Sequence, residues 1–165
     1  MDNQDNYFDK DGITIRKSVM ADAEYLQDKL RQSDIDEIWA SNNISPRDAL
    51  IKGVKNSIYC CTICNGNPIG IFGIVPETIM GSKACIWMLS SEDIRKIKVK
   101  FLRTNREFIN NMLEFYPYLY NHVDARNTES IKWLEYCGAK VNKEPETYGV
   151  ENKKFHYFYF DKKRR

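Results

Sequence analysis

Cysteine and histidine are the first residues to consider for chemistry, because they bind metals and act as nucleophiles. Cys61 and Cys64 have the CxxC spacing of zinc and redox sites. They lie inside an alternating apolar run rather than at a tight turn, and Cys85 and Cys137 do not repeat the spacing. We therefore interpret these cysteines as small hydrophobic side chains and expect no metal site. The two histidines lie in strand-like aromatic runs, outside any metal-spacing motif.

A second candidate for chemistry is the stretch from Asn121 to Val141. Alternating side chains predict a strand at 119–123, which ends at a short polar break. Asn127 or Thr128 can then cap a short amphipathic helix. Gly138 follows the last residue of the apolar stripe, where a left-handed C-cap favours glycine. The pattern predicts one packed unit of strand, asparagine turn, helix, glycine cap and new strand.

Length and charge limit the possible function classes. The 165 residues predict one domain, and 42% apolar with 13% aromatic residues suffices for a core. The net charge is +2, but the last four residues, Lys162-Lys163-Arg164-Arg165, contribute +4. The rest has 21 basic and 23 acidic residues, a balance of −2, which lacks the footprint of a nucleic-acid-binding protein. We interpret the basic tail as a solvated end, with a docking signal as the alternative.

The sequence also predicts a location. It contains no run of 18 apolar residues, so we expect no membrane span. The first five residues are polar and acidic, unlike a secretory signal. Five cysteines, an odd number, indicate free thiols in a reducing compartment.

The elements that must position these residues follow from periodicity and turn signals. We expect a disordered tail at 1–11, a single domain at 12–161 and a basic tail at 162–165. Strands are expected at 13–17, 58–64, 69–75, 84–89, 119–123, 139–141 and 155–160. Helices are expected at 18–33, at 34–39 as a further turn, from 45 onward, at 92–115 and at 127–138. The stretch 142–154 reads as a polar loop. The long helix predicts that 84–89 and 119–123 are parallel, diverging at Leu89 and Val123.

This element order and the asparagine corner resemble the GNAT superfamily of acyl-CoA N-acyltransferases. Asn127, Ser130, Glu135 and Gly138 match the family's strand–asparagine–helix–glycine motif, and Ala139 replaces its aromatic residue. The resemblance implies an α+β fold, an α/β/α sandwich with a mixed central sheet of about six to seven strands and helices on both faces.

Within that superfamily the chain is similar to the small internal virion proteins of short-tailed bacteriophages and to GNAT-like phage proteins related to them. The similarity implies a protein of the host cytoplasm, virion-associated in some relatives, with phage or host proteins as partners. The residues that carry the similarity are Asp36–Ile38, Pro46–Leu50, Pro68–Gly73, Trp87–Leu89, Phe101–Arg103, Tyr116–Val123 and Asn127–Leu134.

The superfamily implies transfer of acetyl from acetyl-CoA to an amine of a protein or a small molecule. The pantetheine arm would follow a strand edge, and the pyrophosphate would bind at the start of the long helix. The residues implied as cofactor contacts are Leu89, Ser90, Ser91, Arg95, Lys98, Lys100 and Asn127. Glu37 and Glu77 are the candidate bases, with an ordinary surface carboxylate as the alternative for each.

The chain departs from the family at two positions of the chemistry. Lys98 and Lys100 replace the glycines that let phosphates approach the backbone. Leu134 replaces the tyrosine that acts as general acid, and Tyr136 lies roughly 200° around the helix from that position. The sequence therefore leaves three hypotheses open: a phage N-acetyltransferase, a non-catalytic virion or assembly protein with the same fold, and a host-factor-binding protein.

Overall fold

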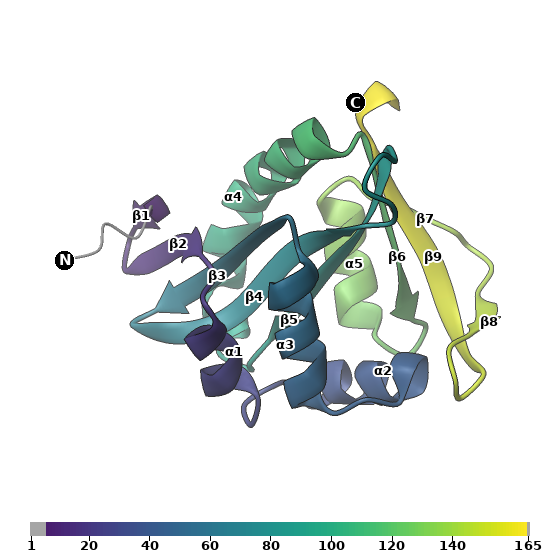
Figure 1. Cartoon of the computed structure of the whole chain (residues 1–165), viewed down its shortest axis with the longest axis horizontal. Coiled ribbons are helices and arrows are strands. Elements are labelled where there is room, and N and C mark those ends of the chain that lie inside the picture. The colour runs from purple at the N-terminus through teal and green to yellow at the C-terminus, as the bar shows by residue number, and fades with distance from the viewer. Residues whose placement is uncertain (1–5, 165) are drawn as a thin grey trace.

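The structure is a computed structural model, and it describes residues 6–164 (Figure 1). The helices are α1 (Met20–Leu26), α2 (Gln32–Asn42), α3 (Pro46–Asn56), α4 (Ile94–Phe115) and α5 (Thr128–Tyr136). The strands are β1 (Asn6–Lys10), β2 (Ile13–Lys17), β3 (Tyr59–Asn65), β4 (Asn67–Pro76), β5 (Lys83–Ser90), β6 (Tyr118–Asp124), β7 (Lys140–Val141), β8 (Glu146–Tyr148) and β9 (Lys153–Asp161).

All of the strands join one mixed sheet, with helices on both faces. The order is β1-β2-β3-β4-β5-β6-β9-β7, and β8 also pairs with β9. The sheet has nine strands rather than the expected six to seven. The two additional strands are β1 and β8, which form in stretches that the sequence analysis expected to be unstructured. The predicted α+β sandwich is confirmed.

The long helix α4 connects two parallel strands, as expected. Backbone pairing of β5 with β6 runs from Lys83↔Tyr118 to Cys85↔Tyr120. The divergence expected at Leu89 and Val123 therefore begins earlier. The cause is a side chain, because Asn121 Nδ2 donates to the carbonyl oxygen of Ile86 at 2.7 Å and replaces the next backbone contact.

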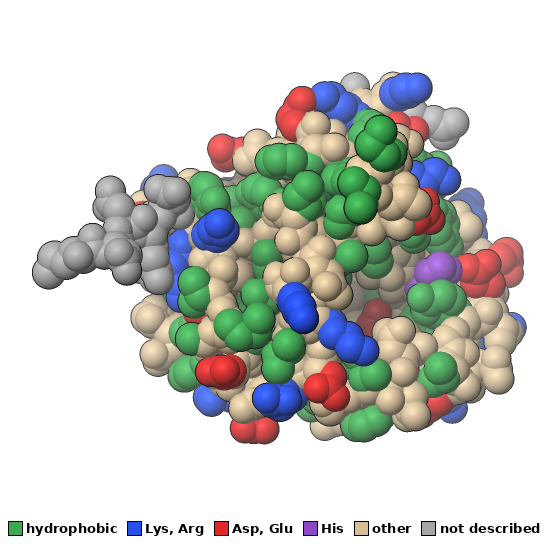
Figure 2. Space-filling model, viewed as in Figure 1, with side chains coloured by type: hydrophobic (Ala, Val, Ile, Leu, Met, Phe, Trp, Pro, Cys, Tyr) green, Lys and Arg blue, Asp and Glu red, His purple; other side chains and the backbone are tan. Residues whose placement is uncertain are grey.

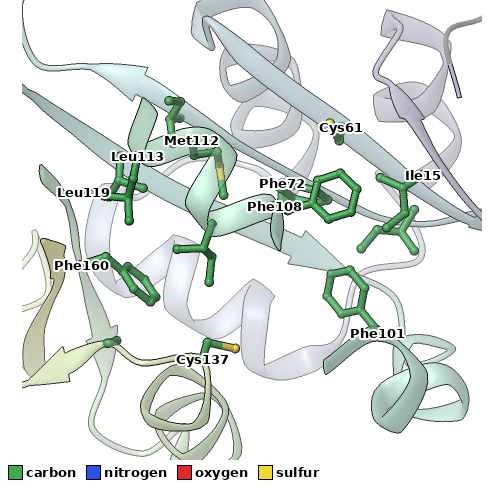
Figure 3. Close-up of a cluster of buried hydrophobic side chains, with 14 of the residues drawn as sticks. Ile15, Cys61, Phe72, Phe101, Phe108, Met112, Leu113, Leu119, Cys137 and Phe160 are labelled. Carbon is green, nitrogen blue, oxygen red and sulfur yellow. The ribbon is translucent and has the colours of Figure 1, made fainter. Parts of the chain in front are cut away.

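Two hydrophobic clusters lie on opposite faces of the sheet because consecutive residues of β4 point in opposite directions. Ile71 packs into the cluster formed with α1, α2 and α3, which includes Leu26 and Leu50. Phe72 packs into the cluster under α4, with its ring centroid 5.5 Å from that of Phe108. Figure 3 shows this second cluster, with side chains from α4 meeting those of the strands. The two clusters therefore share the strand β4.

The expected helix at 18–33 is broken. α1 ends at Leu26, and α2 begins at Gln32. Between them the chain pairs with the end of β5, through a bridge from Leu30 to Ser91. Local periodicity favoured a continuous helix here, but pairing with a distant strand interrupts it.

The ends of the chain also differ from expectation. The tail expected to be disordered at 1–11 contains β1, which pairs antiparallel with β2; residues 1–5 lie outside the described part. Residues 162–164 form a short 3-10 helix, in which Lys162 contacts Glu114 at 2.6 Å. The loop expected at 142–154 contains β8.

The cysteine and membrane expectations can be compared with the structure over residues 6–164. The five cysteines are free thiols in the structure. Burial raises the pKa of Cys61 to about 12 and that of Cys85 to about 11. No helix in residues 6–164 is long and apolar enough to cross a membrane. Within the same range, no group of three or more metal-ligating side chains was found.

Candidate functional site

The separation of β5 and β6 leaves a cavity of about 630 Å³ between these strands and helices α2, α3 and α5. Figure 2 shows a hollow on this face of the molecule. Its wall includes the apolar side chains of Ile38 and Trp87 and the polar side chains of Glu37, Asn127 and Tyr148. A mostly apolar wall with a few converging polar groups is typical of a binding site for a small molecule or a single side chain.

Glu37 and Asn127 meet in this cavity from two helices far apart in the sequence. Asn127 caps α5, because its Oδ1 accepts a hydrogen bond from the amide of Ser130 at 3.2 Å. Its Nδ2 donates to Glu37 Oε2 at 3.3 Å, which links α5 to α2. Burial raises the pKa of Glu37 to about 7, and the nearby carboxylates of Asp34 and Asp124 act in the same direction. The sequence predicted Asn127 as a possible cap, and the structure confirms it.

The two carboxylates near Glu37 each have a cationic partner. Asp34 Oδ1 contacts Arg31 Nη2 at 2.6 Å, and both side chains are buried. Asp124 Oδ2 contacts Arg126 Nη2 at 2.6 Å. Burial alone would raise the pKa of Asp124, but hydrogen bonds from Arg126 hold it below its usual range. Glu37 has no ion pair of this kind among the described residues; hydrogen bonds from Asn127 and from the backbone of Asp124 favour its charged form.

Glu77, the other candidate base, lies elsewhere. It follows β4 in the connection to β5, is exposed, and accepts a hydrogen bond from the hydroxyl of Tyr120 at 3.0 Å. It is not among the residues that line the cavity. Sequence analysis named Glu37 and Glu77 as separate candidate bases, and the structure places only Glu37 beside Asn127.

The first three residues of α4 have their backbone amides already bonded. The N–H groups of residues 94–96 donate to the carbonyl oxygens of residues 91–93, at 3.0 to 3.2 Å. Glu92 and Asp93 are both exposed at this end of the helix. Carboxylates are favourable beside a helix N-terminus, where they compensate its positive end. Both carboxylates are ion-paired with cations of the first turn of α4, Glu92 with Arg95 and Asp93 with Lys96.

The cations of this region are paired as well. Lys98 Nζ and Arg95 Nη2 both contact the carboxylate of Glu129 at 3.0 Å, and Arg95 also contacts Glu92. Hydrogen bonds from Lys98 first, and then from Arg95, lower the pKa of Glu129. Lys100 is exposed on the same helix. Arg95 and Lys98 thus connect α4 to α5.

The end of β5 is also occupied from within the chain. The backbone N–H of Ser90 donates to Asp34 Oδ2 at 2.9 Å, and its carbonyl oxygen accepts from the backbone N–H of Arg31 at 2.9 Å. Leu89 packs against the cluster formed with α1, α2 and α3. The hydroxyl of Ser91 donates to the carbonyl oxygen of Ile69 at 3.3 Å.

Comparison with solved structures decides the fold family. A spermidine N-acetyltransferase from Vibrio cholerae, solved in complex with CoA and spermine, is 14% identical, with a TM-score of 0.62 over 94% of this chain and 98% of that chain. A ribosomal-protein-S5-alanine acetyltransferase from Vibrio fischeri is 14% identical, with a TM-score of 0.67 over 95% of this chain and 97% of that chain. The chain has the GNAT fold.

Comparison by sequence gives a different kind of relative. A family model described as "Bacteriophage T7, probable scaffold protein Gp13" matches residues 72–145, from within β4 to just before β8. A search of curated proteins found no match. The fold thus connects this chain with GNAT N-acetyltransferases, and the sequence of its central part is similar to a phage scaffold family.

The residues expected to hold CoA in a GNAT fold do not fit the cofactor in this structure. A pyrophosphate would need unpaired amides at the start of α4, and those of residues 94–96 are bonded to the chain itself. No residue between Gly66 and Gly138 has a positive φ, so the connection between β5 and α4 contains no left-handed turn of the kind that shapes a phosphate loop. The pantetheine edge at Ser90 is paired with Arg31 and Asp34.

The position of the general acid is apolar. Leu134 lies in the cavity wall and packs against the core under α4. Tyr136 is exposed on the other side of α5, with its ring 5.4 Å from the guanidinium of Arg106. The cavity wall does contain a phenol, that of Tyr148, whose ring stacks on His122 with 3.8 Å between the ring centroids. Sequence reasoning missed Tyr148, because a three-residue strand in a polar segment gives little periodic signal.

Proposed function

We propose that this chain is a bacteriophage virion or assembly protein that keeps the GNAT fold without acetyl-CoA turnover. The observation that carries the proposal is the first turn of α4, where the N–H groups of residues 94–96 are bonded to the carbonyl oxygens of residues 91–93. The cations Arg95 and Lys96 at the same place are ion-paired with Glu92 and Asp93 rather than directed at a ligand. The similarity of residues 72–145 to a phage scaffold family supports an assembly role. The protein would be made in the host cytoplasm, and its partners would be phage or host proteins.

Calorimetric titration with acetyl-CoA tests the loss of the cofactor. We expect no heat of binding at millimolar acetyl-CoA and low ionic strength, where an attraction between Lys98 or Lys100 and phosphate would be strongest. Saturable binding would overturn the proposal. Lys98→Glu combined with Lys100→Glu would then show whether the phosphates lie near α4, because this change would weaken any such binding.

An amine N-acetyltransferase is the second candidate, and one observation favours it. Glu37 lies in the cavity with a pKa of about 7, which suits a general base near neutral pH. Under this hypothesis Glu37 would take a proton from an amine, and Asn127 would hold its carboxylate in place. The acceptor would be an amine of a protein or a small molecule.

Complementation in a phage that lacks this gene distinguishes the two functions. Under the assembly proposal, particle yield is restored equally by the wild type and by Glu37→Gln, because the fold alone is required. A catalytic role predicts that Glu37→Gln fails while Glu77→Gln succeeds. The second substitution is the matched control, since Glu77 is a carboxylate outside the cavity.

A further inference from the structure

The edge of β5 that faces the cavity between β5 and β6 carries backbone N–H and carbonyl groups that do not pair with the backbone of β4 or β6. Ser91 donates its N–H to Ile69 of β4, so the residues that alternate with it point their backbone groups away from β4. Ile86, Met88 and Ser90 are these residues, and beyond Cys85 they have no paired residue on β6. An extended ligand with amide groups could pair with this edge as an additional strand.

The chain itself supplies such a pairing at Ser90. The N–H of Arg31 donates to the carbonyl oxygen of Ser90, and Asp34 accepts the N–H of Ser90, each at 2.9 Å. Leu30 bridges to Ser91 in the antiparallel sense. One donor and one acceptor from the chain thus occupy the two groups that a ligand amide chain would use.

The pairing is built into the interior rather than resting on the surface. Arg31 and Asp34 have side-chain exposures of 7% and 5%. If the segment left the edge, the buried N–H and carbonyl groups of Ser90 would lose their partners, which is costly. Burial raises the pKa of Asp34, while Arg31 and the amide of Ser90 favour its charged form.

We propose that the segment Leu30–Asp34 is a built-in occupant of the β5 edge, replacing the extended amide-containing ligand that this opening in a GNAT fold would otherwise accept. Four residues earlier on β5, the side chain of Asn121 donates to the carbonyl oxygen of Ile86. Groups of the protein itself therefore occupy the edge of β5 at both Ile86 and Ser90. This inference goes beyond the assembly proposal, because it concerns what occupies the edge of β5.

Amide hydrogen exchange of the full chain, followed by NMR, tests the inference. Without any cofactor, the Ser90 amide should exchange slowly. In Asp34→Ala it should exchange at least about tenfold faster, because a hydrogen bond to a charged group is lost. Asp34→Asn keeps the shape and an acceptor oxygen, so it covers the case in which the alanine variant does not fold. We expect an intermediate exchange rate from the asparagine variant.

Two controls make the result specific to the edge. Asp36→Ala removes an exposed carboxylate of the same helix and should leave Ser90 exchange unchanged. Ser90→Ala removes a buried hydroxyl that has no hydrogen-bond partner among the described residues, and it keeps both backbone contacts. It should leave the pairing intact.

Repeating the exchange experiment with acetyl-CoA added distinguishes failure of this inference from failure of the proposed function. Fast exchange of Ser90 in the free wild type, with protection only after acetyl-CoA is added, would overturn the inference. Acetyl-CoA binding with Ser90 slow in both states would overturn the assembly proposal, and it would support the inference because the ligand would then bind away from this edge.

Discussion

Glu37 is a carboxyl group whose surroundings oppose its charge. It lies in the cavity wall, with an amide as its described partner and two further carboxylates nearby. Because burial raises its pKa to about 7 from 4.5, the folded protein takes up a proton at a higher pH than the unfolded chain does. Its ionisation therefore opposes folding.

Replacing Glu37 by glutamine should change how stability depends on pH. At pH 4.5 the carboxyl is protonated in the folded protein and about half protonated in the unfolded chain, so ionisation costs the fold little stability. This cost grows as the pH rises and is complete above about pH 7. We expect Glu37→Gln to be more stable than the wild type at pH 8 by about 1–3 kcal/mol, and to differ little at pH 4.5. Urea unfolding at both pH values measures this difference.

The exposed Glu24→Gln of α1 is the control for that experiment, because it removes one carboxylate without changing the cavity. A difference between Glu37→Gln and wild type that is the same at pH 4.5 and pH 8 would contradict the raised pKa.

Sequence reasoning selected Glu37 through the resemblance alone. It missed Asp34, because the role of that carboxylate depends on the backbone amide of Ser90, 56 residues away in the sequence.

At the scale of elements, the parts that sequence could predict are those that depend on near neighbours. The cap of α5 by Asn127 and the start of α3 at Ser45-Pro46 need only the next few residues, and both are present. The break between α1 and α2 and the strand β8 depend on pairing with β5 and β9. Such contacts leave no periodic signal in the local sequence. The local pattern therefore predicts a continuous helix across the break between α1 and α2, and a loop where β8 forms.

The end of α5 allows a test of a local prediction. Gly138 has a φ of 95°, its N–H donates to the carbonyl oxygen of Glu135, and that of Ala139 donates to the carbonyl oxygen of Leu134. These two bonds form a Schellman motif. We expect Gly138→Ala to reduce the free energy of unfolding by about 1 kcal/mol, because a side chain disfavours this backbone conformation. Chemical denaturation measures the loss.

Lys132→Ala on the exposed side of α5 is the matched control, since it changes the same helix without affecting its end. It should shift stability by less than about 0.5 kcal/mol. Equal stability of Gly138→Ala and wild type would mean that the helix ends at another residue in solution.

At the scale of the whole molecule, the sheet separates two hydrophobic clusters that share β4. Leu50 is fully buried in the cluster on one face, and Leu119 is fully buried in the cluster on the other. Because Ile71 and Phe72 are adjacent in β4 and belong to different clusters, neither cluster can lose its order without disturbing the strand that supports the other. The fold should therefore unfold as one cooperative unit.

Leu50→Ala and Leu119→Ala test that coupling from opposite faces. Each leaves a cavity in a fully buried place and should cost about 2–5 kcal/mol. Trp87 packs against the cluster of Leu50, and Trp133 packs against the cluster of Leu119, so tryptophan fluorescence reports on both faces. We expect fluorescence and far-ultraviolet circular dichroism to give the same urea midpoint in both variants. Two separated transitions in either variant would show that the faces unfold independently, and that β4 does not couple them.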